Sequence, residues 1–158
     1  MGVSGCGKTT LGKAVAASLG SQFVDADDFH PPQNIAKMAA GLSLTDQDRD
    51  PWLAGIAAKL VSMRSEGRSF VLACSALKQC YRESLIQSAP GLIIVWLDGM
   101  PDLILERMLS RNDHFMPPDL LESQFATLEP PTCDIRLDIR EPVADLVSRI
   151  HVILGSRE

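Results

Sequence analysis

The length, composition and charge of the chain indicate one ordinary folded domain. Of its 158 residues, 46% are hydrophobic and 22% are charged, which argues against disorder, collagen and coiled coil. The longest apolar run, Leu92 to Leu97, is far shorter than the roughly 20 residues that cross a bilayer, so no membrane partner is expected. A net charge of −5 and 5% aromatic residues argue against a nucleic-acid partner.

The cysteines and the first residues bear on the cellular compartment. Cys6, Cys74, Cys80 and Cys133 show neither paired spacing nor a zinc-finger pattern with histidine, which predicts reduced thiols. Met1 is followed at once by a glycine-rich motif, and no basic segment precedes an apolar one, so no signal peptide is visible. We therefore expect a cytoplasmic protein.

In the first half of the chain, helical patterns alternate with short apolar runs. Gly20 is the expected stop of a first helix and Asp50 the expected cap of a third, in which large apolar residues recur every three or four positions. The residues Trp52, Met38 and Met63 are interpreted as core. The predicted helices cover Thr9–Leu19, Pro31–Gly41 and Pro51–Glu66, and the predicted strands cover Gln22–Asp27 and Phe70–Cys74.

The second half continues the alternation. Like Phe70–Cys74, the run Leu92–Leu97 is continuously apolar, as expected of strands that are covered on both faces of a parallel sheet. Strands that alternate with helices predict a three-layer α/β domain. Further predicted elements are helices over Leu77–Ser88, Pro101–Arg111, Pro118–Leu128 and Pro142–Leu154, and a strand over Asp134–Ile139.

The strongest motif is a P-loop at the start of the chain, where the residues from Gly2 to Thr9 fit the pattern G-x-x-x-x-G-K-[ST] and lead into a helix. Backbone N–H groups of such a loop converge on phosphates, and the motif predicts that Lys8 reaches the β- and γ-phosphates while Thr9 ligates Mg²⁺. Cys6 is interpreted as a small filler rather than a redox-sensitive thiol. The predicted nucleotide-binding residues are Gly2, Val3, Ser4, Gly5, Cys6, Gly7, Lys8, Thr9 and Thr10.

An acidic segment lies at the carboxyl end of the strand predicted over Gln22–Asp27, where ligands of open α/β sheets bind. Alternation along a strand would place Asp25 and Asp27 on one face, with Asp25 near Mg²⁺ and Asp27 able to accept the proton of an attacking alcohol. A solvated loop that caps the next helix is the alternative. His30, just before two prolines, is a weaker candidate because a loop histidine can simply bond to backbone.

With these motifs the chain resembles the P-loop carbohydrate kinases called gluconokinases, which are relatives of shikimate kinase and adenylate kinase. The resemblance extends over nearly the whole chain and includes two departures, Thr45 in place of asparagine and Asp113 in place of glycine. It rests on motifs in order: Asp25 to Pro31, Leu44 to Trp52, Ala73 to Lys78 with Tyr81-Arg82, His114 to Met116, and Ser123 to Pro130.

The resemblance implies transfer of the γ-phosphoryl group of ATP, with Mg²⁺, to the C6 hydroxyl of D-gluconate. Arg49 would hold the gluconate carboxylate as a bidentate partner, or else form a surface salt bridge with Asp46 or Asp48. Ser75, Lys78 and Arg82 would bind substrate, although Lys78 and Arg82 four residues apart also suit a solvated helix face. His30 would join Asp27 at the substrate, and relatives suggest a possible homodimer.

The resemblance also implies a mobile lid around residues 107–118, where an arginine reaches the transferring phosphate. Arg111 is favoured over Arg107 because it lies nearer the loop, and an arginine that interacts with the helix dipole is the plain alternative. Lys8, Asp27 and Arg111 are therefore the expected catalytic residues.

A strand normally precedes a P-loop, but here only Met1 stands before Gly2. We therefore expect one P-loop kinase domain over residues 1–158 that lacks its first strand, which leaves two half-sheets, through truncation or a start set too late. Two other functions stay open. One is phosphorylation of another small polar acid such as shikimate, and the other is nucleotide binding with impaired catalysis.

Overall fold

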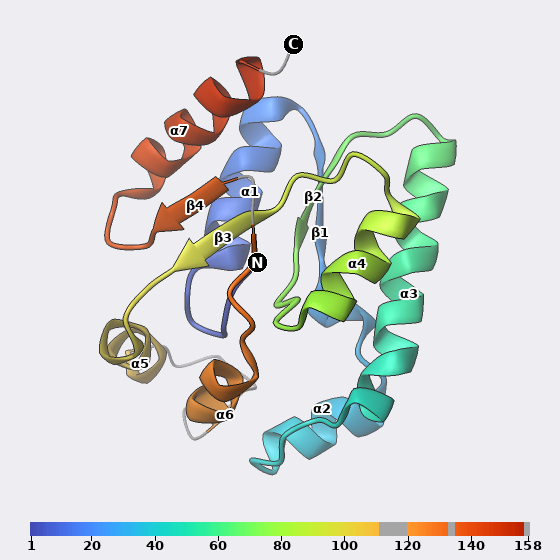
Figure 1. The fold of residues 1–158 in the computed structure, drawn as a ribbon, viewed down its shortest axis with the longest axis vertical. Helices are drawn as coiled ribbons and strands as arrows, with labels where there is room; N and C mark the ends of the chain where they lie inside the picture. The colour runs from blue at the N-terminus through green and yellow to red at the C-terminus, as the bar shows by residue number, and fades with distance from the viewer. Residues whose placement is uncertain (111–119, 133–134, 157–158) are drawn as a thin grey trace.

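The computed structural model describes residues 1–110, 120–132 and 135–156. It shows four short parallel strands among helices in these residues, which confirms the predicted α/β class (Figure 1). In chain order the elements are α1 (Lys8–Leu19), β1 (Gln22–Asp25), the 3-10 turn η1 (Ala26–Phe29), α2 (Pro32–Ala39), α3 (Asp46–Ser65), β2 (Phe70–Ala73), α4 (Gln79–Ser88), β3 (Val95–Asp98), α5 (Pro101–Leu109), α6 (Leu120–Thr127), β4 (Ile135–Asp138) and α7 (Val143–Gly155).

In the described residues, the strands form two separate parallel pairs, as the sequence predicts. One pair joins β1 to β2, with Gln22 opposite Phe70, and the other joins β3 to β4, with Val95 opposite Ile135. The N-terminus lies between the pairs in Figure 1. There the Met1 carbonyl accepts a hydrogen bond from Leu97 N at 2.9 Å, and Gly2 N donates to the Ser75 carbonyl at 3.2 Å. The start of the P-loop is thus attached to both half-sheets.

The hydrophobic core follows this division. One cluster joins α1, α7 and α5 to the β3–β4 pair, and Leu137 and Ile104 are almost completely buried within it. The second cluster joins α3 and α4 to the end of β2, and it contains Trp52 and Ile56. Trp52, Met38 and Met63 are all buried, which confirms their interpretation as core. No helix in the described ranges is both long and apolar enough to span a membrane.

The predicted end of the first strand is wrong. β1 ends at Asp25, because the Asp25 carboxylate accepts a hydrogen bond from Asp27 N at 3.2 Å and thereby caps the turn η1. Asp25 and Asp27 therefore do not alternate along one strand face. The structure instead places Asp27 one turn beyond the strand, on the side of α3.

Two further boundaries differ for equally local reasons. α3 begins at Asp46 rather than Pro51, because Thr45 and Asp48 form a capping box in which Thr45 Oγ1 accepts from Asp48 N at 3.2 Å. β3 begins at Val95 rather than Leu92, since Leu92 N closes a turn onto the Ala89 carbonyl at 3.1 Å. The other predicted elements agree within a few residues where the chain is described.

Candidate active site

The P-loop enters α1 through backbone that only glycine adopts readily. Gly7 caps α1 with a φ of 98°, and Gly5 has a φ of 82°. A Cβ on Gly5 would also lie 2.6 Å from Cγ of Met108, so the loop rests directly on α5. Lys8 Nζ donates to the Val3 carbonyl at 2.9 Å, which folds the lysine side chain back over the loop. The contact of Lys8 with phosphate stays a prediction.

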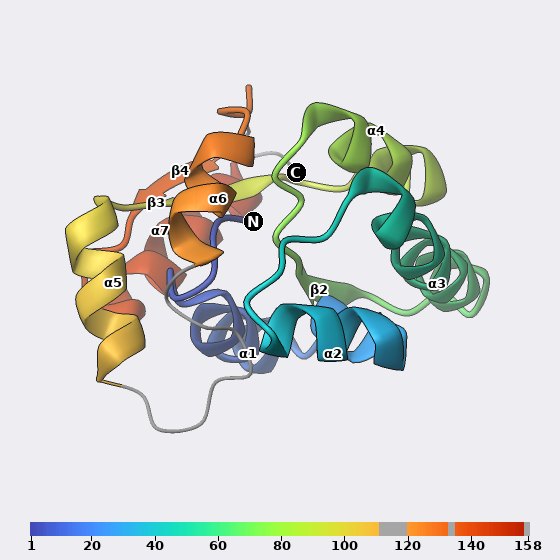
Figure 2. The same cartoon turned by 90° about the horizontal axis from the view of Figure 1, so that it is seen from below.

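A neutral side chain from another part of the chain reaches this loop. Ser4 N donates to Oε1 of Gln124 at 2.6 Å, and Gln124 belongs to α6, 120 residues further along the chain. Nothing in the local sequence predicts this contact for Gln124, although the residue lies in the motif from Ser123 to Pro130 that contributed to the resemblance. α6 lies beside the P-loop in the view of Figure 2.

Thr9 near the start of α1 and Asp25 at the end of β1 bring two side-chain oxygens together. Thr9 Oγ1 donates to Asp25 Oδ2 at 3.0 Å. Among the described residues, no group of three or more acidic, histidine or cysteine side chains could hold a metal ion. A hydroxyl and one carboxylate beside a phosphate-binding loop fit Mg²⁺, which usually takes few protein ligands and completes its shell with phosphate oxygens and water.

A cavity of about 120 Å³ lies next to the P-loop. It brings together residues of α1, η1, α2, α3, α4, α6 and the loops between these elements. The polar residues that line it are Ser4, Lys8, Asp27, His30, Ser43, Arg49, Ser75, Tyr81, Ser123, Gln124 and Thr127. The predicted residues Lys8, Asp27, His30, Arg49 and Ser75 therefore converge on one pocket.

The imidazole ring of His30 is fixed in this pocket by stacking on an aromatic side chain. Its ring stacks on Trp52, with ring centroids 4.8 Å apart, and Trp52 Nε1 is fixed by donation to the Ala26 carbonyl at 2.7 Å. Nδ1 of His30 is buried, and no atom of the described residues forms a hydrogen bond with it. Burial, aided by the positive charge of Arg49, lowers the pKa of His30 to about 4. The ring is therefore neutral near pH 7 and presents an unpaired nitrogen.

Arg49 is positioned by a chain of polar groups from α3 and α4. Its Nη1 donates to the Tyr81 hydroxyl at 3.3 Å, and that hydroxyl donates to Asp46 Oδ1 at 2.5 Å. Lys78 Nζ donates to both Asp46 oxygens at 2.7 Å. These hydrogen bonds, that from Lys78 foremost, lower the pKa of Asp46. Arg49 Nη1 also lies 3.5 Å from Asp46 Oδ1, one helical turn away, so the alternative of a salt bridge with a nearby aspartate is confirmed. Tyr81 had no predicted role, because only the packing of α3 on α4 brings it to Arg49.

Lys78 and Arg82 do not line the pocket. Lys78 is the extended N-cap of α4, so the helical face that it was predicted to share with Arg82 does not form. Arg82 is buried and donates through Nη1 to the carbonyls of Ala76 and Leu77, each at 2.9 Å. Arg82 thereby holds the loop after β2, whereas the Lys78 side chain pairs with Asp46 of α3. Ala76 in that loop has a positive φ of 43°.

The lid prediction lies only partly within the described residues. Arg111 is outside them. Arg107, the less favoured candidate, donates through Nη2 to the Ile139 carbonyl at 2.8 Å and thereby anchors α5 to the end of β4. The structure thus places Arg107 in a structural contact, and the role of Arg111 stays a prediction.

Fold and site together define a P-loop phosphotransferase, with a phosphate loop, a hydroxyl–carboxylate pair and a pocket for a second substrate. A family model described as an AAA domain matches residues 1–131. The chain is 43% identical over 163 residues to the thermosensitive gluconokinase of Escherichia coli, covering 100% of this chain and 87% of that protein. The chain belongs to the gluconokinase family of P-loop kinases.

Two solved structures support this assignment. A sugar kinase from Janibacter sp. matches with a TM-score of 0.93 at 45% identity, covering 98% of this chain and 91% of that chain. A gluconokinase from Sinorhizobium meliloti matches with a TM-score of 0.87 at 44% identity, covering 99% and 89%. These similarities do not favour a kinase of another small acid such as shikimate.

The low pKa of His30 predicts a pH dependence of stability. Unfolded chains bind a proton at this residue below about pH 6.5, whereas the folded protein binds it only near pH 4. The unfolded state therefore holds more protons between these values, and the free energy of unfolding falls as the pH drops from 6.5 to 4. His30→Phe, which keeps a ring against Trp52, should show a shallower decline in urea denaturation.

The matched control for this prediction is His151→Phe on α7. It removes a histidine remote from the pocket and should keep the parental slope. Equal slopes for His30→Phe and the parent between pH 6.5 and 4 would contradict the assignment of a neutral, desolvated His30.

Proposed function

We propose that this chain transfers the γ-phosphoryl group of ATP to the C6 hydroxyl of D-gluconate, yielding ADP and 6-phosphogluconate. The observation that carries the proposal is the cavity beside the P-loop, in which a candidate base, a neutral histidine and a carboxylate-binding arginine meet the phosphate-binding Lys8. The family membership supports the choice of gluconate. Phosphoryl transfer depends mainly on positioning and charge neutralisation, which such a pocket can supply.

In this proposal the P-loop residues Gly2 to Thr10 bind the ATP phosphates, and Lys8 turns from the Val3 carbonyl toward the transferred group. Thr9 and Asp25 would hold Mg²⁺, which supplies neutralisation of phosphate charge when it is bound. Asp27 accepts the proton of the C6 hydroxyl while the hydroxyl oxygen forms a bond to the γ-phosphorus. The bond between that phosphorus and the ADP oxygen breaks in the same step. Arg111 is the proposed lid arginine.

The second substrate is recognised by the opposite wall of the pocket. Arg49 binds the gluconate carboxylate with the guanidinium N–H groups that Tyr81 and Asp46 do not use. The His30 and Ser75 side chains, which line the pocket, bond to hydroxyl groups along the sugar acid. Lys78 and Arg82 contribute by holding Asp46 and the loop after β2 rather than by touching substrate.

A coupled assay of ADP release against a panel of sugar acids and shikimate tests the function. We expect turnover with D-gluconate well above every other acid, and phosphorus NMR of the product should show a phosphate monoester at C6. Measurable ATP binding without turnover on any acid would favour a nucleotide-binding module instead. Turnover on shikimate above gluconate would replace the proposed substrate.

The role of Asp27 predicts a selective loss. Asp27→Ala should lower kcat by about 10²- to 10⁴-fold, the usual contribution of a general base, while calorimetry shows ATP binding close to that of the parent. Lys8→Ala should abolish turnover and weaken ATP binding as well. The neighbouring exposed Asp28→Ala is the control and should retain parental kcat. Activity of Asp27→Ala within about tenfold of the parent would remove it as the base.

The role of Arg49 predicts an effect on the acid substrate alone. Arg49→Lys keeps the positive charge but loses the planar fork, so KM for gluconate should rise about 10- to 100-fold, as expected when hydrogen bonds between charged groups are lost. KM for ATP should stay within about twofold. Arg68→Lys, an exposed residue paired with Glu66, is the matched control. An unchanged KM for gluconate would contradict carboxylate binding by Arg49.

A further inference from the structure

Lys78 lies outside the pocket but binds the aspartate that borders Arg49. Its Nζ donates to both oxygens of Asp46 at 2.7 Å, and Asp46 Oδ1 also accepts from the Tyr81 hydroxyl at 2.5 Å. Arg49 and Tyr81 belong to the pocket lining, whereas Lys78 and Asp46 stand behind it. Lys78 is therefore one residue removed from the arginine proposed to bind the substrate carboxylate.

The Asp46 carboxylate is placed to compete with an acid substrate for Arg49. The two residues are three apart on α3, so their side chains share one face of the helix. Arg49 Nη1 nevertheless stays 3.5 Å from Asp46 Oδ1, longer than the roughly 2.9 Å of an ordinary N–H···O bond. Arg49 donates instead to the Tyr81 hydroxyl at 3.3 Å. Arg49 and Asp46 thus form an ion pair without a direct hydrogen bond.

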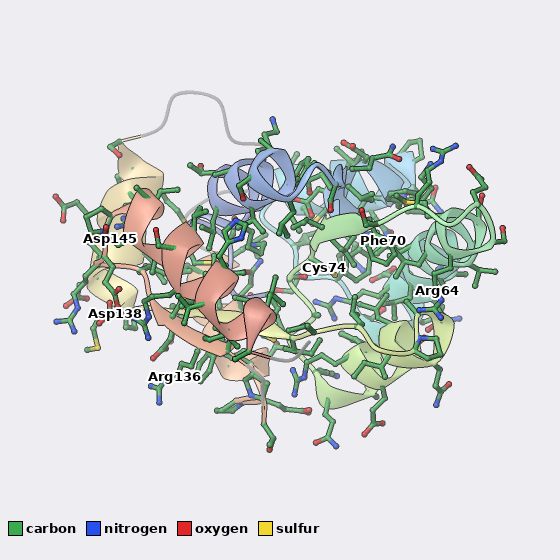
Figure 3. All side chains as sticks on the ribbon, turned by 90° about the horizontal axis from the view of Figure 1, so that it is seen from above. Arg64, Phe70, Cys74, Arg136, Asp138 and Asp145 are labelled. Carbon is green, nitrogen blue, oxygen red and sulfur yellow. The ribbon has the colours of Figure 1, made fainter. Side chains whose placement is uncertain are left out.

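An arginine–aspartate pair elsewhere in the fold is bonded directly. Arg136 donates to Asp98 through Nε at 3.0 Å and through Nη2 at 2.5 Å. Figure 3 labels Arg136 on β4, far from Arg64 of α3. No lysine of the described ranges forms an ion pair with Asp98, whereas Lys78 occupies Asp46. The comparison indicates that an aspartate without a lysine partner binds a neighbouring arginine directly.

The groups around Arg49 keep their charges near pH 7. The hydrogen bond from Lys78 is the main cause that lowers the pKa of Asp46, and the same bond raises the pKa of Lys78. Burial, followed by the bond to Asp46, raises the pKa of Tyr81, so its hydroxyl stays protonated and donates. The charges of Lys78 and Asp46 offset each other, which leaves the positive charge of Arg49 for an anion in the pocket.

We infer that Lys78 is a positioning residue for the acid substrate. By saturating both oxygens of Asp46, Lys78 keeps the Arg49 guanidinium from closing onto that carboxylate. The N–H groups and the charge of Arg49 then stay available to the carboxylate of a sugar acid. This role rests on the proposed function, since it takes a small carboxylate as the ligand of Arg49.

Loss of the Lys78 ammonium would act on binding of the acid rather than on chemistry. Asp46 would then hold Arg49 as Asp98 holds Arg136. The substrate carboxylate would have to displace Asp46, and it would meet a cluster without an excess of positive charge. Transfer of the phosphoryl group would be little affected, because the reacting C6 hydroxyl is at the other end of the sugar acid from the carboxylate.

The test is a double-mutant cycle on Lys78 and Asp46. Lys78→Met keeps most of the side-chain length and should raise KM for D-gluconate about 10- to 100-fold, as expected when a hydrogen bond between charged groups is weakened. Both kcat and KM for ATP should stay within about threefold. In an Asp46→Asn background, the same change should raise KM for D-gluconate less than about threefold, because no carboxylate competes for Arg49.

Lys37→Met is the matched control. It removes a lysine that donates to Asp48 Oδ2 at 2.6 Å, in an ion pair of the same kind near the start of α3. KM for D-gluconate should stay within about twofold of the parent, because Asp48 bonds to Lys37 and Thr45 rather than to Arg49. A rise as large as that of Lys78→Met would overturn the role of Lys78, since any disturbance of α3 would then suffice.

A second measurement uses no substrate and so separates this role from the proposed function. In a crystal structure of unliganded Lys78→Met, Arg49 should donate directly to Asp46 at about 2.9 Å rather than stay at 3.5 Å. An Arg49 that stays on Tyr81 would overturn the role of Lys78, and so would an equal rise in KM in both backgrounds of the cycle. A parent that does not phosphorylate gluconate, together with closure of Arg49 onto Asp46 in Lys78→Met, would contradict the proposed function alone.

Discussion

Backbone hydrogen bonds to both half-sheets fix the position of the phosphate-binding loop. Leu97 N holds Met1 to β3, and the Ser75 carbonyl holds Gly2 to the loop after β2. All site residues depend on this attachment, because β2 leads to Ser75 and α4 while the P-loop leads directly into α1. If the half-sheets moved apart, the lysine of the loop would separate from the wall that carries Arg49 and Tyr81.

The distribution of charge follows from the same arrangement. The chain is acidic as a whole, with a net charge of −5, but Lys8 and Arg49 line one small pocket, and Lys78 pairs with Asp46 outside its lining. Asp46 balances the charge of Lys78 and, through Tyr81, orients Arg49. The net charge of the chain therefore argues against a polyanion partner, whereas the cations that line the pocket determine which small anions it can hold.

Local chemistry made much of the fold predictable. The P-loop and the apolar period of α3 are short-range patterns, and both appear where the sequence predicts. The prediction failed where a side chain formed a hydrogen bond with a backbone group that a longer strand would leave free. The Asp25 carboxylate accepts from Asp27 N and thereby ends β1. It failed again at Arg82, since spacing along a helix does not reveal that the guanidinium is buried against two carbonyls.

The parts of the site that the sequence analysis missed are those that depend on long-range packing. Gln124 meets Ser4 only because α6 packs beside the P-loop, and Asp46 meets Tyr81 only because α3 packs on α4. Their neighbours along the chain carry no local sign of these contacts. A motif thus predicts which residues carry chemistry more readily than which residues orient them.

The contact between Gln124 and Ser4 links ligand binding at the loop to the position of α6. The Gln124 oxygen is an uncharged acceptor on an N–H group of a loop built to bind anions. A ligand oxygen that takes this N–H must first release the Gln124 side chain, and with it one tie between α6 and the loop. Occupancy of the loop and the position of α6 are therefore coupled through this hydrogen bond.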